Sequence, residues 1–425
     1  MLLVGALVLA APSRAATSVP GCELVFPAAS SCTYVATQVQ SWVGNGPFHL
    51  RVAFTDGSGR LRTRYEVNQP AGPATSAGLT DAQQVGIGDT VTATVLGPGA
   101  FLGIGNPGAV PNSGLHAGPV APRLKGNTTP VHDPAIAFEH GWYYLYVTGT
   151  GIPVRRSRDL VHWIGDGQVF PNNLPAWAPK LIPGTQSPWA PDLSFFGGKW
   201  HLYYAISTFG AKRSAVGHAV NATLDRRDPR YGWHDLGPVV ASTELADPSA
   251  VPTDDNALDP NVILDDTGAP HLVFGSFYGG IKELALDPVT GAANQSVLPT
   301  PLAANVQEYT AVEGAFVIRR DGWYYLFASY DYCCRGTDST YNVRVGRSRS
   351  VSGPFVDDLG IPMLTGGGRY VLTSGGDMRG PGHNAIIRRG NQYDIVFHWY
   401  DAANKATPTL GILPLHWTAD GWPST

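Results

Sequence analysis

The sequence predicts an all-β protein: a five-bladed β-propeller preceded by a small N-terminal β-sandwich-like domain. Composition gives the first indication, because the 425 residues include 51 Gly and 35 Pro but only 15% charged residues, which is typical of strands joined by tight turns. The second is an N-terminal region in which apolar and polar residues alternate. The third is a repeat of aromatic strand patterns that runs from about residue 116 to the end of the chain.

The first residues predict export. Residues 1–16, MLLVGALVLAAPSRAA, form an apolar run that ends in small residues, as a secretory signal peptide does. We therefore expect a secreted, extracellular protein. No segment of the sequence reaches the ~20 apolar residues that span a membrane, so we expect no membrane partner. The net charge of −4 and the lack of a basic stripe also argue against nucleic acid as a partner.

Residues 17–115 predict the small β domain. FHLRVAFTD, RLRTRYEV and DTVTATVLG alternate apolar and polar residues between turn signals, which is the period of half-buried strands. GPGAFLGIGNPGAVPNSG then predicts a glycine-rich linker. We expect an accessory domain that either binds carbohydrate or only stabilises the main domain. Cys22 and Cys32 suit a local disulfide of an exported protein.

Residues 116–425 predict the propeller that forms the main domain. The aromatic strand patterns are GWYYLYVTG (141–149), GKWHLYYAIS (198–207), GAPHLVFGSF (268–277), GWYYLFASY (322–330) and NQYDIVFHWYD (391–401). Each follows a turn with Gly or Asn, and a shorter strand precedes each one. Five such units of roughly 60 residues are typical of propeller blades.

A polar residue begins the strand before each aromatic pattern: Asp133, Asp192, Asp259, Glu313 and His383. A propeller gathers the starts of its innermost strands around a central channel, so we expect these side chains to converge. A turn-capping Asp in every blade would explain such a repeat without any chemistry. A purely structural repeat should keep one residue type, however. Here the type changes from Asp to Glu to His, which favours a functional cluster.

Clustered carboxylates in an exported protein predict sugar chemistry. Glycoside hydrolysis needs one carboxylic acid to protonate the leaving oxygen and one carboxylate to activate water or attack carbon. A third acid can raise the pKa of the proton donor, because like charges disfavour ionisation. The competing uses are a calcium loop and a two-metal phosphatase site. The sequence has no D-x-D-x-D-G loop and few His residues near the motifs, which argues against both.

Five motifs together resemble those of family 43 glycoside hydrolases, most of all the endo-α-1,5-L-arabinanases. They are His132-Asp133-Pro134, Trp189-Ala190-Pro191-Asp192, Leu258-Asp259-Pro260-Asn261, Val312-Glu313-Gly314 and Gly380-Pro381-Gly382-His383-Asn384. The resemblance implies a five-bladed propeller that cleaves α-1,5-L-arabinofuranosidic bonds in arabinan, including the arabinan side chains of pectin. It also implies endo action by an inverting single displacement. We expect the enzyme to be a monomer.

The resemblance implies a role for each residue of the catalytic group. Asp133 is the expected general base and Glu313 the general acid, while Asp259 is the third acid, which raises the pKa of Glu313 and orients it. His383 matches a histidine that lies beside a metal ion, usually calcium. Calcium prefers oxygen ligands, so we expect a largely water-coordinated ion, with a hydrogen-bonded channel histidine as the alternative.

Four further residues are assigned to substrate binding: His132, Trp189, Asp192 and Asn261. His132 either contacts substrate or holds Asp133 in place. Trp189 is either a stacking platform for a sugar or a core residue, and stacking is favoured. Asp192 either binds a sugar hydroxyl or caps its strand, and the cap is favoured. Asn261 belongs to the third motif.

Three alternatives stay open. The same site suits an exo-acting α-L-arabinofuranosidase or β-xylosidase, which requires a channel blocked beyond the terminal sugar. A propeller that binds carbohydrate without cleaving it is an alternative of a different class, and the presence of all three acids argues against it. Cys333 and Cys334 are adjacent, and they either form a vicinal disulfide or stay free and buried.

Overall fold

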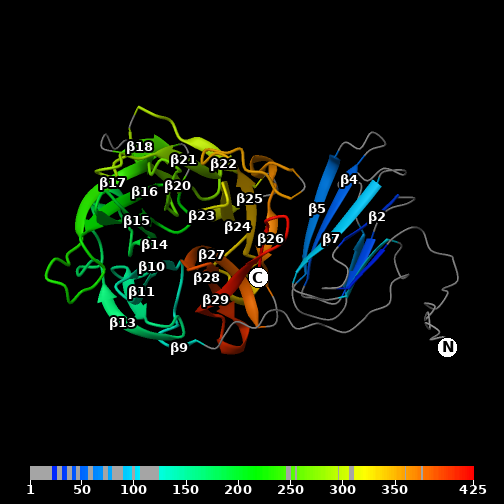
Figure 1. Ribbon diagram of the computed structural model, residues 1–425, viewed down its shortest axis with the longest axis horizontal. Helices are drawn as coiled ribbons and strands as arrows, with labels where there is room; N and C mark the ends of the chain where they lie inside the picture. Colours follow the sequence, from blue (N-terminus) through cyan, green and yellow to red (C-terminus); the bar gives the residue numbers. More distant parts are fainter. Residues whose placement is uncertain are drawn as a thin grey trace, which may run out of the picture. The chain divides into compact units, whose positions relative to one another are not determined.

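The structure is a computed structural model of the whole chain (Figure 1). It describes residues 124–425 except 246–249, 254–255, 295, 306–310, 359 and 375–376, and the backbone of the strands that precede them. By their contacts, most of the residues up to His116 form one compact unit, and Ala117–Thr425 form the body of a second. Each unit is described by itself.

The N-terminal unit contains the strands expected from the alternating patterns. Its strands are β1 (Cys22–Val25), β2 (Ser31–Val35), β3 (Ser41–Gly44), β4 (Phe48–Thr55), β5 (Leu61–Gln69), β6 (Thr75–Gly78), β7 (Thr90–Gly97) and β8 (Phe101–Gly105). They form two four-stranded sheets, in the orders β1-β8-β3-β6 and β2-β7-β4-β5. Residues 1–16 and the side chains of Cys22 and Cys32 lie outside the described residues. The signal peptide and the disulfide between these cysteines therefore stay predictions.

The second unit consists of five mainly antiparallel sheets, which follow one another around a ring in Figure 1. Blade one contains β10 (Ala135–Glu139), β11 (Trp142–Tyr146), β12 (Pro153–Ser157), β13 (His162–Gln168) and the parallel edge strand β9 (Lys125–Gly126). Blade two contains β14 (Trp189–Phe196), β15 (Lys199–Ser207), β16 (Ser214–Asn221), β17 (His234–Ser242) and the parallel edge strand β18 (Val251–Thr253). Blade three contains β19 (Asn261–Leu264), β20 (Pro270–Phe274), β21 (Ile281–Ala285) and β22 (Thr300–Ala303). Blade four contains β23 (Val312–Arg320), β24 (Trp323–Tyr330), β25 (Asn342–Ser348) and β26 (Arg369–Leu372). Blade five contains β27 (Met378–Arg389), β28 (Gln392–Asp401), β29 (Thr407–Trp417) and β30 (Pro423–Ser424).

Helical structure in the described part of the chain is confined to short turns. These are α1 (Ala178–Leu181), η2 (Thr243–Leu245), η4 (Gly336–Asp338), η5 (Met363–Thr365) and η6 (Ala402–Asn404). Among the described residues, no helix is both long and apolar enough to cross a lipid bilayer. The all-β five-bladed propeller predicted from the aromatic repeat is confirmed, and each aromatic pattern is the second strand of its blade.

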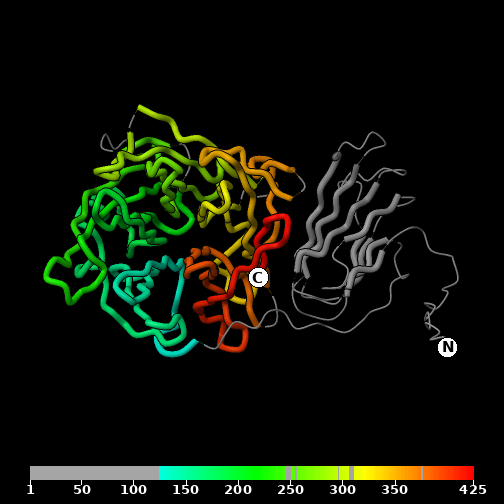
Figure 2. The backbone as a smooth tube through the Cα atoms, in the orientation of Figure 1, coloured from blue at the N-terminus to red at the C-terminus, as the bar shows by residue number. Residues whose placement is uncertain are grey.

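The ring is closed between blade five and blade one, as the tube in Figure 2 shows. The inner strands contact each other in the order β10, β14, β19, β23 and β27, and β27 also contacts β10. The segment before β10 runs along blade five, where the Val131 N–H donates to the Pro408 carbonyl at 2.9 Å and the Leu410 N–H to the Thr128 carbonyl at 3.0 Å. A closed ring fixes the starts of all five inner strands around one axis.

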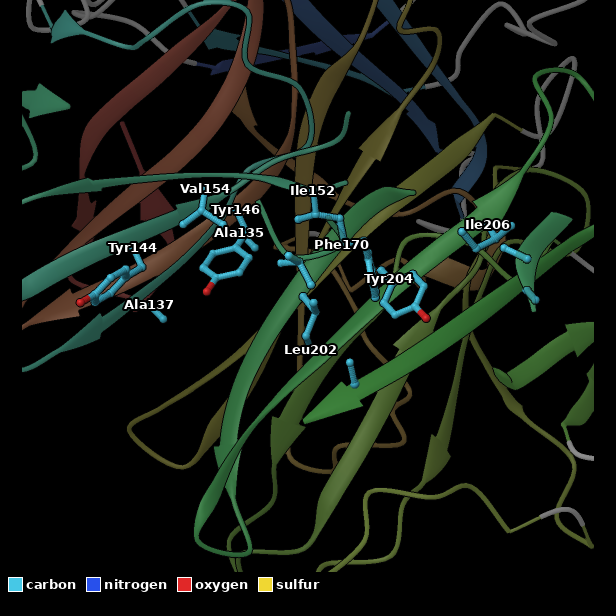
Figure 3. Close-up of a cluster of buried hydrophobic side chains, with 14 of the residues drawn as sticks. Ala135, Ala137, Tyr144, Tyr146, Ile152, Val154, Phe170, Leu202, Tyr204 and Ile206 are labelled. Atoms are coloured by element: carbon cyan, nitrogen blue, oxygen red, sulfur yellow. The ribbon is translucent and has the colours of Figure 1, made fainter. Parts of the chain in front are cut away.

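The hydrophobic core is divided into clusters that lie between neighbouring blades. Between blades one and two, the aromatic strands supply Tyr144, Tyr146, Leu202 and Tyr204, all fully buried (Figure 3). Similar clusters fill the spaces between the other blades, including the one at the closure. Because large aromatic residues each bury a great deal of apolar area, these clusters hold the blades together.

The inner strands share a register that differs from the one the sequence suggests. Counted back from the hairpin pair that closes each strand, Asp133, Ala190, Gly314 and His383 hold the same place. Their φ angles are +48°, +43°, +57° and +46°, and Asp259 has +54°. In three of these strands the register also shifts here, which marks a β-bulge.

This register corrects the expectation of five equivalent polar residues. Asp133, Asp259 and His383 are equivalent, but Glu313 lies one residue before the shared position and Asp192 two residues after it. In blades one and three, the shared position and the residue before it both line the cavity, as His132 with Asp133 and Leu258 with Asp259. In blades two and four only the preceding residue, Trp189 or Glu313, does so.

Candidate active site

A cavity of about 670 Å³ opens where the inner strands begin. Strand starts from all five blades contribute His132, Asp133, Trp189, Leu258, Asp259, Glu313 and His383. The end of β15 adds Ser207, and loops add Thr148, Thr208, Phe209, Gly210, Ala211, Asn256, Ser276, Phe277, Tyr278, Tyr332, Cys333, Cys334 and Arg335. The structure thus brings together all three predicted catalytic carboxylates, the metal candidate His383, and two of the four expected substrate-binding residues.

Asp133 is surrounded by hydrogen-bond donors and histidines. Its Oδ2 accepts from the Thr148 hydroxyl at 2.6 Å, and its Oδ1 lies 2.9 Å from His132 Nδ1 and 3.2 Å from His383 Nδ1. Burial alone would raise the pKa of this carboxyl, but His132, His383 and His398 outweigh burial and hold the pKa well below its usual range. Asp133 is therefore a carboxylate at neutral pH.

His398 and Tyr400 form a layer behind the base that sequence reasoning missed. The Asp133 N–H donates to His398 Nδ1 at 3.1 Å, and the Tyr400 hydroxyl lies 2.7 Å from His132 Nε2. The His132 and His398 rings stack with their centroids 3.8 Å apart. Both missed residues lie in the aromatic pattern of blade five, distant in sequence from His132 and Asp133. The local sequence does not single them out, because the same strand also contains Gln392, Asp394 and Asp401.

Glu313 has a different environment from Asp133. Its Oε2 accepts from the Ser276 hydroxyl at 2.6 Å and its Oε1 from the Tyr341 hydroxyl at 3.0 Å. Burial raises the pKa of Glu313, the two hydrogen bonds partly oppose this effect, and the nearby charge of Asp133 adds to it. The net direction is upward, so Glu313 tends to keep its proton where Asp133 does not.

Asp259 shares its environment with Glu313. Burial and the charges of Glu313 and Asp133 raise the pKa of Asp259 well above its usual value. Its Oδ2 accepts from the Gly314 N–H at 2.9 Å, so it is bonded to the residue directly after Glu313. The backbone at Gly314 also passes close to His383, because a Cβ added to Gly314 would lie 3.2 Å from the His383 Cα. Asp259 and Glu313 thus form a buried carboxyl pair that retains a proton.

The histidines near Asp133 differ in the direction of their pKa shifts. Burial lowers the pKa of His132, but the Asp133 carboxylate and Glu313 more than compensate, so the net direction is upward. Burial lowers the pKa of His383, and it lowers that of His398 well below the usual value. Of the three rings, His132 therefore has the pKa that most favours a positive charge beside the base.

His383 can hold a metal ion only as part of a mixed donor set. Its Nδ1 lies 3.2 Å from Asp133 Oδ1 and 3.7 Å from Asp259 Oδ2. One imidazole and two carboxylates fall short of the 6–8 oxygen ligands of calcium, so water would have to supply the rest. The side-chain amide of Asn384 and Nε2 of His398 are buried without a hydrogen-bond partner among the described residues. Orphaned polar atoms of this kind mark places for water, so the donor set fits a hydrated cation.

Aromatic residues line the outer part of the cavity. Trp189 is half-buried, lines the cavity and also packs against a small buried cluster of Ala190, Ala205 and Leu258, so both expected roles are compatible with its position. Phe209 on a blade-two loop is 83% exposed, and Tyr278 on a blade-three loop is 48% exposed. Exposed aromatic rings beside a polar cavity are suited to stacking on sugar faces. The loop aromatics could not be anticipated, because only the folded ring brings these loops to the channel.

Asp192 and Asn261 lie behind the cavity wall, which corrects their assignment to substrate binding. Both are buried, and Asn261 Nδ2 donates to Asp192 Oδ1 at 2.9 Å. Asp192 Oδ2 also accepts from the Val262 N–H at 3.0 Å, and Asn261 Oδ1 accepts from the Val317 N–H at 2.8 Å. The two side chains therefore link the inner strands of blades two, three and four. Burial raises the pKa of Asp192 to about 6.

Cys333 and Cys334 form a vicinal disulfide at the cavity, which decides between the two states left open by the sequence. Cys334 is exposed and has a φ of +65°. Its backbone N–H donates to the Tyr400 hydroxyl at 2.8 Å, and its Sγ lies 3.9 Å from His132 Nε2.

The cavity combines one ionised carboxylate, a buried carboxyl pair that retains a proton, and exposed aromatic rings. A base and an acid held in opposite protonation states on one cavity are the requirement for cleaving a glycosidic bond. The fold and the site therefore define a glycoside hydrolase of the propeller type.

Comparison with known proteins assigns the family. Residues 127–423 match the model of the glycosyl hydrolases family 43. The chain is 38% identical over 308 residues to an extracellular exo-alpha-(1→5)-L-arabinofuranosidase of Cellvibrio japonicus, covering 69% of this chain and 85% of the relative. It is 37% identical over 299 residues to an extracellular endo-alpha-(1→5)-L-arabinanase of Bacillus subtilis, covering 69% and 87%.

Solved structures give the same result. An exo-1,5-alpha-L-arabinanase from a bovine ruminal metagenomic library matches with a TM-score of 0.65 and 38% identity over 70% of this chain and 97% of the other. An alpha-L-arabinanase of Cellvibrio cellulosa in complex with arabinohexaose matches with a TM-score of 0.65 and 36% identity over 70% and 95%. The chain belongs to glycoside hydrolase family 43.

Proposed function

We propose that this enzyme hydrolyses α-1,5-L-arabinofuranosidic bonds of arabinan, within the chain, by an inverting single displacement. One observation carries the mechanism: Asp133 and Glu313 face the same cavity in environments that move their pKa values in opposite directions. Similarity to relatives named for action on α-1,5-linked arabinan, with identities of up to 38%, supports the substrate.

Asp133 acts as the general base in this proposal. The Thr148 hydroxyl and His132 Nδ1 hold its two oxygens from different sides, at 2.6 and 2.9 Å, so the carboxylate cannot rotate freely. It accepts a proton from a water molecule while the water oxygen forms a bond to the anomeric carbon of the arabinofuranose. The depressed pKa keeps this group ionised into acidic solution.

Glu313 acts as the general acid. It gives its proton to the oxygen of the departing sugar as the bond from that oxygen to the anomeric carbon breaks. The hydroxyls of Ser276 and Tyr341 stabilise the carboxylate that remains. Asp259 is the second carboxyl of the buried pair, and two neighbouring carboxyls oppose each other's ionisation, which favours a proton on the pair. It also fixes the backbone after Glu313 through the Gly314 N–H.

A hydrated cation beside His383 is part of the proposal, because the donor set there fits one. His383 would hold it, with Asp133 and Asp259 nearby, and the ion would supply positive charge at the end of the channel. We also propose that the enzyme is exported and acts as a monomer on arabinan, including the side chains of pectin. Relatives with extracellular in their names support export.

Exo action on the same bonds is the second candidate, because the compared proteins include both exo and endo enzymes. The products of linear, debranched α-1,5-arabinan, followed by chromatography over time, decide between the two. A spread of arabino-oligosaccharides in the first minutes is the expected result, and arabinose alone would establish exo action. The Glu313→Gln variant, prepared in the same way, controls for a contaminating activity.

Absence of products from arabinan, with turnover of xylan or galactan, would reject the proposed substrate while leaving the family assignment intact.

A further inference from the structure

The vicinal disulfide is connected to the catalytic base by an unbroken chain of polar contacts. The Cys334 N–H donates to the Tyr400 hydroxyl at 2.8 Å, and that hydroxyl lies 2.7 Å from His132 Nε2. The other ring nitrogen, His132 Nδ1, lies 2.9 Å from Asp133 Oδ1. The chain of contacts thus runs from the cavity rim to the carboxylate through Tyr400 and His132.

The contacts on Tyr400 show what this chain does. The Cys334 N–H occupies one acceptor position of the Tyr400 hydroxyl, and the same hydroxyl is in hydrogen-bond contact with His132 Nε2. With Nε2 held by Tyr400, the other ring nitrogen, Nδ1, points at Asp133 Oδ1. The Cys334 N–H thus helps to hold Tyr400, and through it the His132 ring, in the orientation that supports the base.

The direction of the Cys334 N–H depends on the disulfide. Cys334 is exposed and has a left-handed φ of +65°, which is unfavourable for a residue with a Cβ. The bond between the two sulfur atoms closes a small ring that permits few backbone conformations. Opening the ring would free Cys334 to leave the left-handed region. It would also place a thiol near His132 Nε2, which now lies 3.9 Å from the Cys334 Sγ, as a competing partner.

We propose that the Cys333–Cys334 disulfide is a positioning element for catalysis: it holds the Cys334 N–H on Tyr400 and thereby fixes the orientation of the His132 ring beside Asp133. Tyr400 is the second positioning residue of the same device. This inference rests on the proposed role of Asp133 as the base, and it predicts an effect on kcat rather than on KM.

The test compares the oxidised enzyme with the enzyme reduced by tris(2-carboxyethyl)phosphine. The phosphine is oxidised to its oxide with oxygen from water, and the disulfide takes up the two electrons and two protons to become two thiols. We expect kcat on linear arabinan to fall about tenfold, the effect of one lost hydrogen bond in the active site, while KM changes less than twofold. Turnover by the oxidised enzyme tests the proposed function separately, before any reductant is added.

Two variants serve as controls. The Cys333→Ser/Cys334→Ser variant should resemble the reduced enzyme and lose its response to the phosphine, which excludes an effect through Cys22 and Cys32. In Tyr400→Phe the relay is already cut, so reduction should add less than a twofold further loss of kcat. An additive tenfold loss in Tyr400→Phe, or an increase of KM alone, would overturn the proposal and indicate direct contact between the disulfide and the sugar.

The ¹⁵N spectrum of His132 gives a second test that does not depend on activity. Imidazole ¹⁵N chemical shifts of His132, assigned by comparison with His132→Gln, report the hydrogen bonds of the two ring nitrogens. Reduction should change these shifts, that of Nε2 most, because the ring loses its fixed contact with Tyr400. Free-thiol titration verifies that the ring has opened. Unchanged shifts and unchanged kcat after complete reduction would refute a positioning role.

Discussion

Tyr341→Phe tests the electrostatic account of the general acid. This substitution removes only the hydroxyl that donates to Glu313 Oε1 at 3.0 Å and keeps the buried ring, which packs closely against Gly382. Hydrogen bonds to a carboxylate favour its ionised form. Losing one should therefore raise the pKa of Glu313 beyond the increase that burial already causes.

The magnitude follows from the strength of one such bond. A hydrogen bond to a charged group contributes about 1.5–3 kcal/mol, and one pKa unit corresponds to about 1.4 kcal/mol. The Tyr341 bond is the longer of the two on Glu313, because the Ser276 hydroxyl lies at 2.6 Å. We therefore expect an upward shift of about one pKa unit. The same bond stabilises the carboxylate formed in the transition state, so kcat should fall by roughly tenfold.

The assay is the pH dependence of kcat on linear arabinan. Glu313 must be protonated to act as an acid, so activity is lost as the pH rises through its pKa, and a higher pKa moves the alkaline limb to higher pH. Tyr325→Phe is a matched control, because its hydroxyl donates to the Gly421 carbonyl at 2.7 Å, away from the cavity. An alkaline limb that stays in place, or moves to lower pH, would refute the assigned role of Glu313.

Three further predictions concern the carboxylates and their supports. Asp133→Asn and Glu313→Gln should each lower kcat by about 10²–10⁴-fold with an unchanged melting temperature, and a loss of only tenfold would count against the assigned roles. Asp259→Asn leaves Glu313 without the second carboxyl of the buried pair, and two such carboxyls oppose each other's ionisation. The last proton of the pair should then be lost at lower pH, so the alkaline limb of the pH–rate profile should move to lower pH. A shift in the opposite direction would show that the pair does not share a proton as described. Asn261→Ala leaves buried partners unpaired on Asp192 and on a backbone N–H, so the free energy of unfolding should fall by about 2–4 kcal/mol in denaturant titration. In the same variant kcat at 25 °C should change less than threefold. A selective increase of KM would instead show that Asn261 takes part in substrate binding.

The fold was predictable because each blade carries its own local signal. Aromatic strands and glycine turns repeat along the chain, and a repeat of this period has few architectures available to it. The catalytic acids were predictable for a similar reason, since Asp133 and Asp259 each precede a proline at the start of an inner strand. The residues that carry the chemistry could therefore be recognised from the unusual local sequence around them.

The register within the inner strands was not predictable. Glu313 and Asp192 resemble Asp133 in sequence, but the bulges place one before and the other after the shared position. A bulge breaks the simple alternation of side chains along a strand, so such small offsets decide between the cavity and the wall behind it. The partners His398, Tyr400 and Tyr341 meet the acids only through ring closure, which leaves no local trace in the sequence.

The configuration of the first product tests the central claim most directly. Proton NMR of arabinan hydrolysis in its first minutes, before the anomers equilibrate, identifies the anomer of the newly released reducing end. A base that activates water opposite the general acid must deliver the β-furanose from an α-linked substrate, and we predict that the β anomer appears first. Initial release of the α anomer would mean retention through a covalent intermediate, and would contradict the assignment of Asp133 as the base of a single displacement.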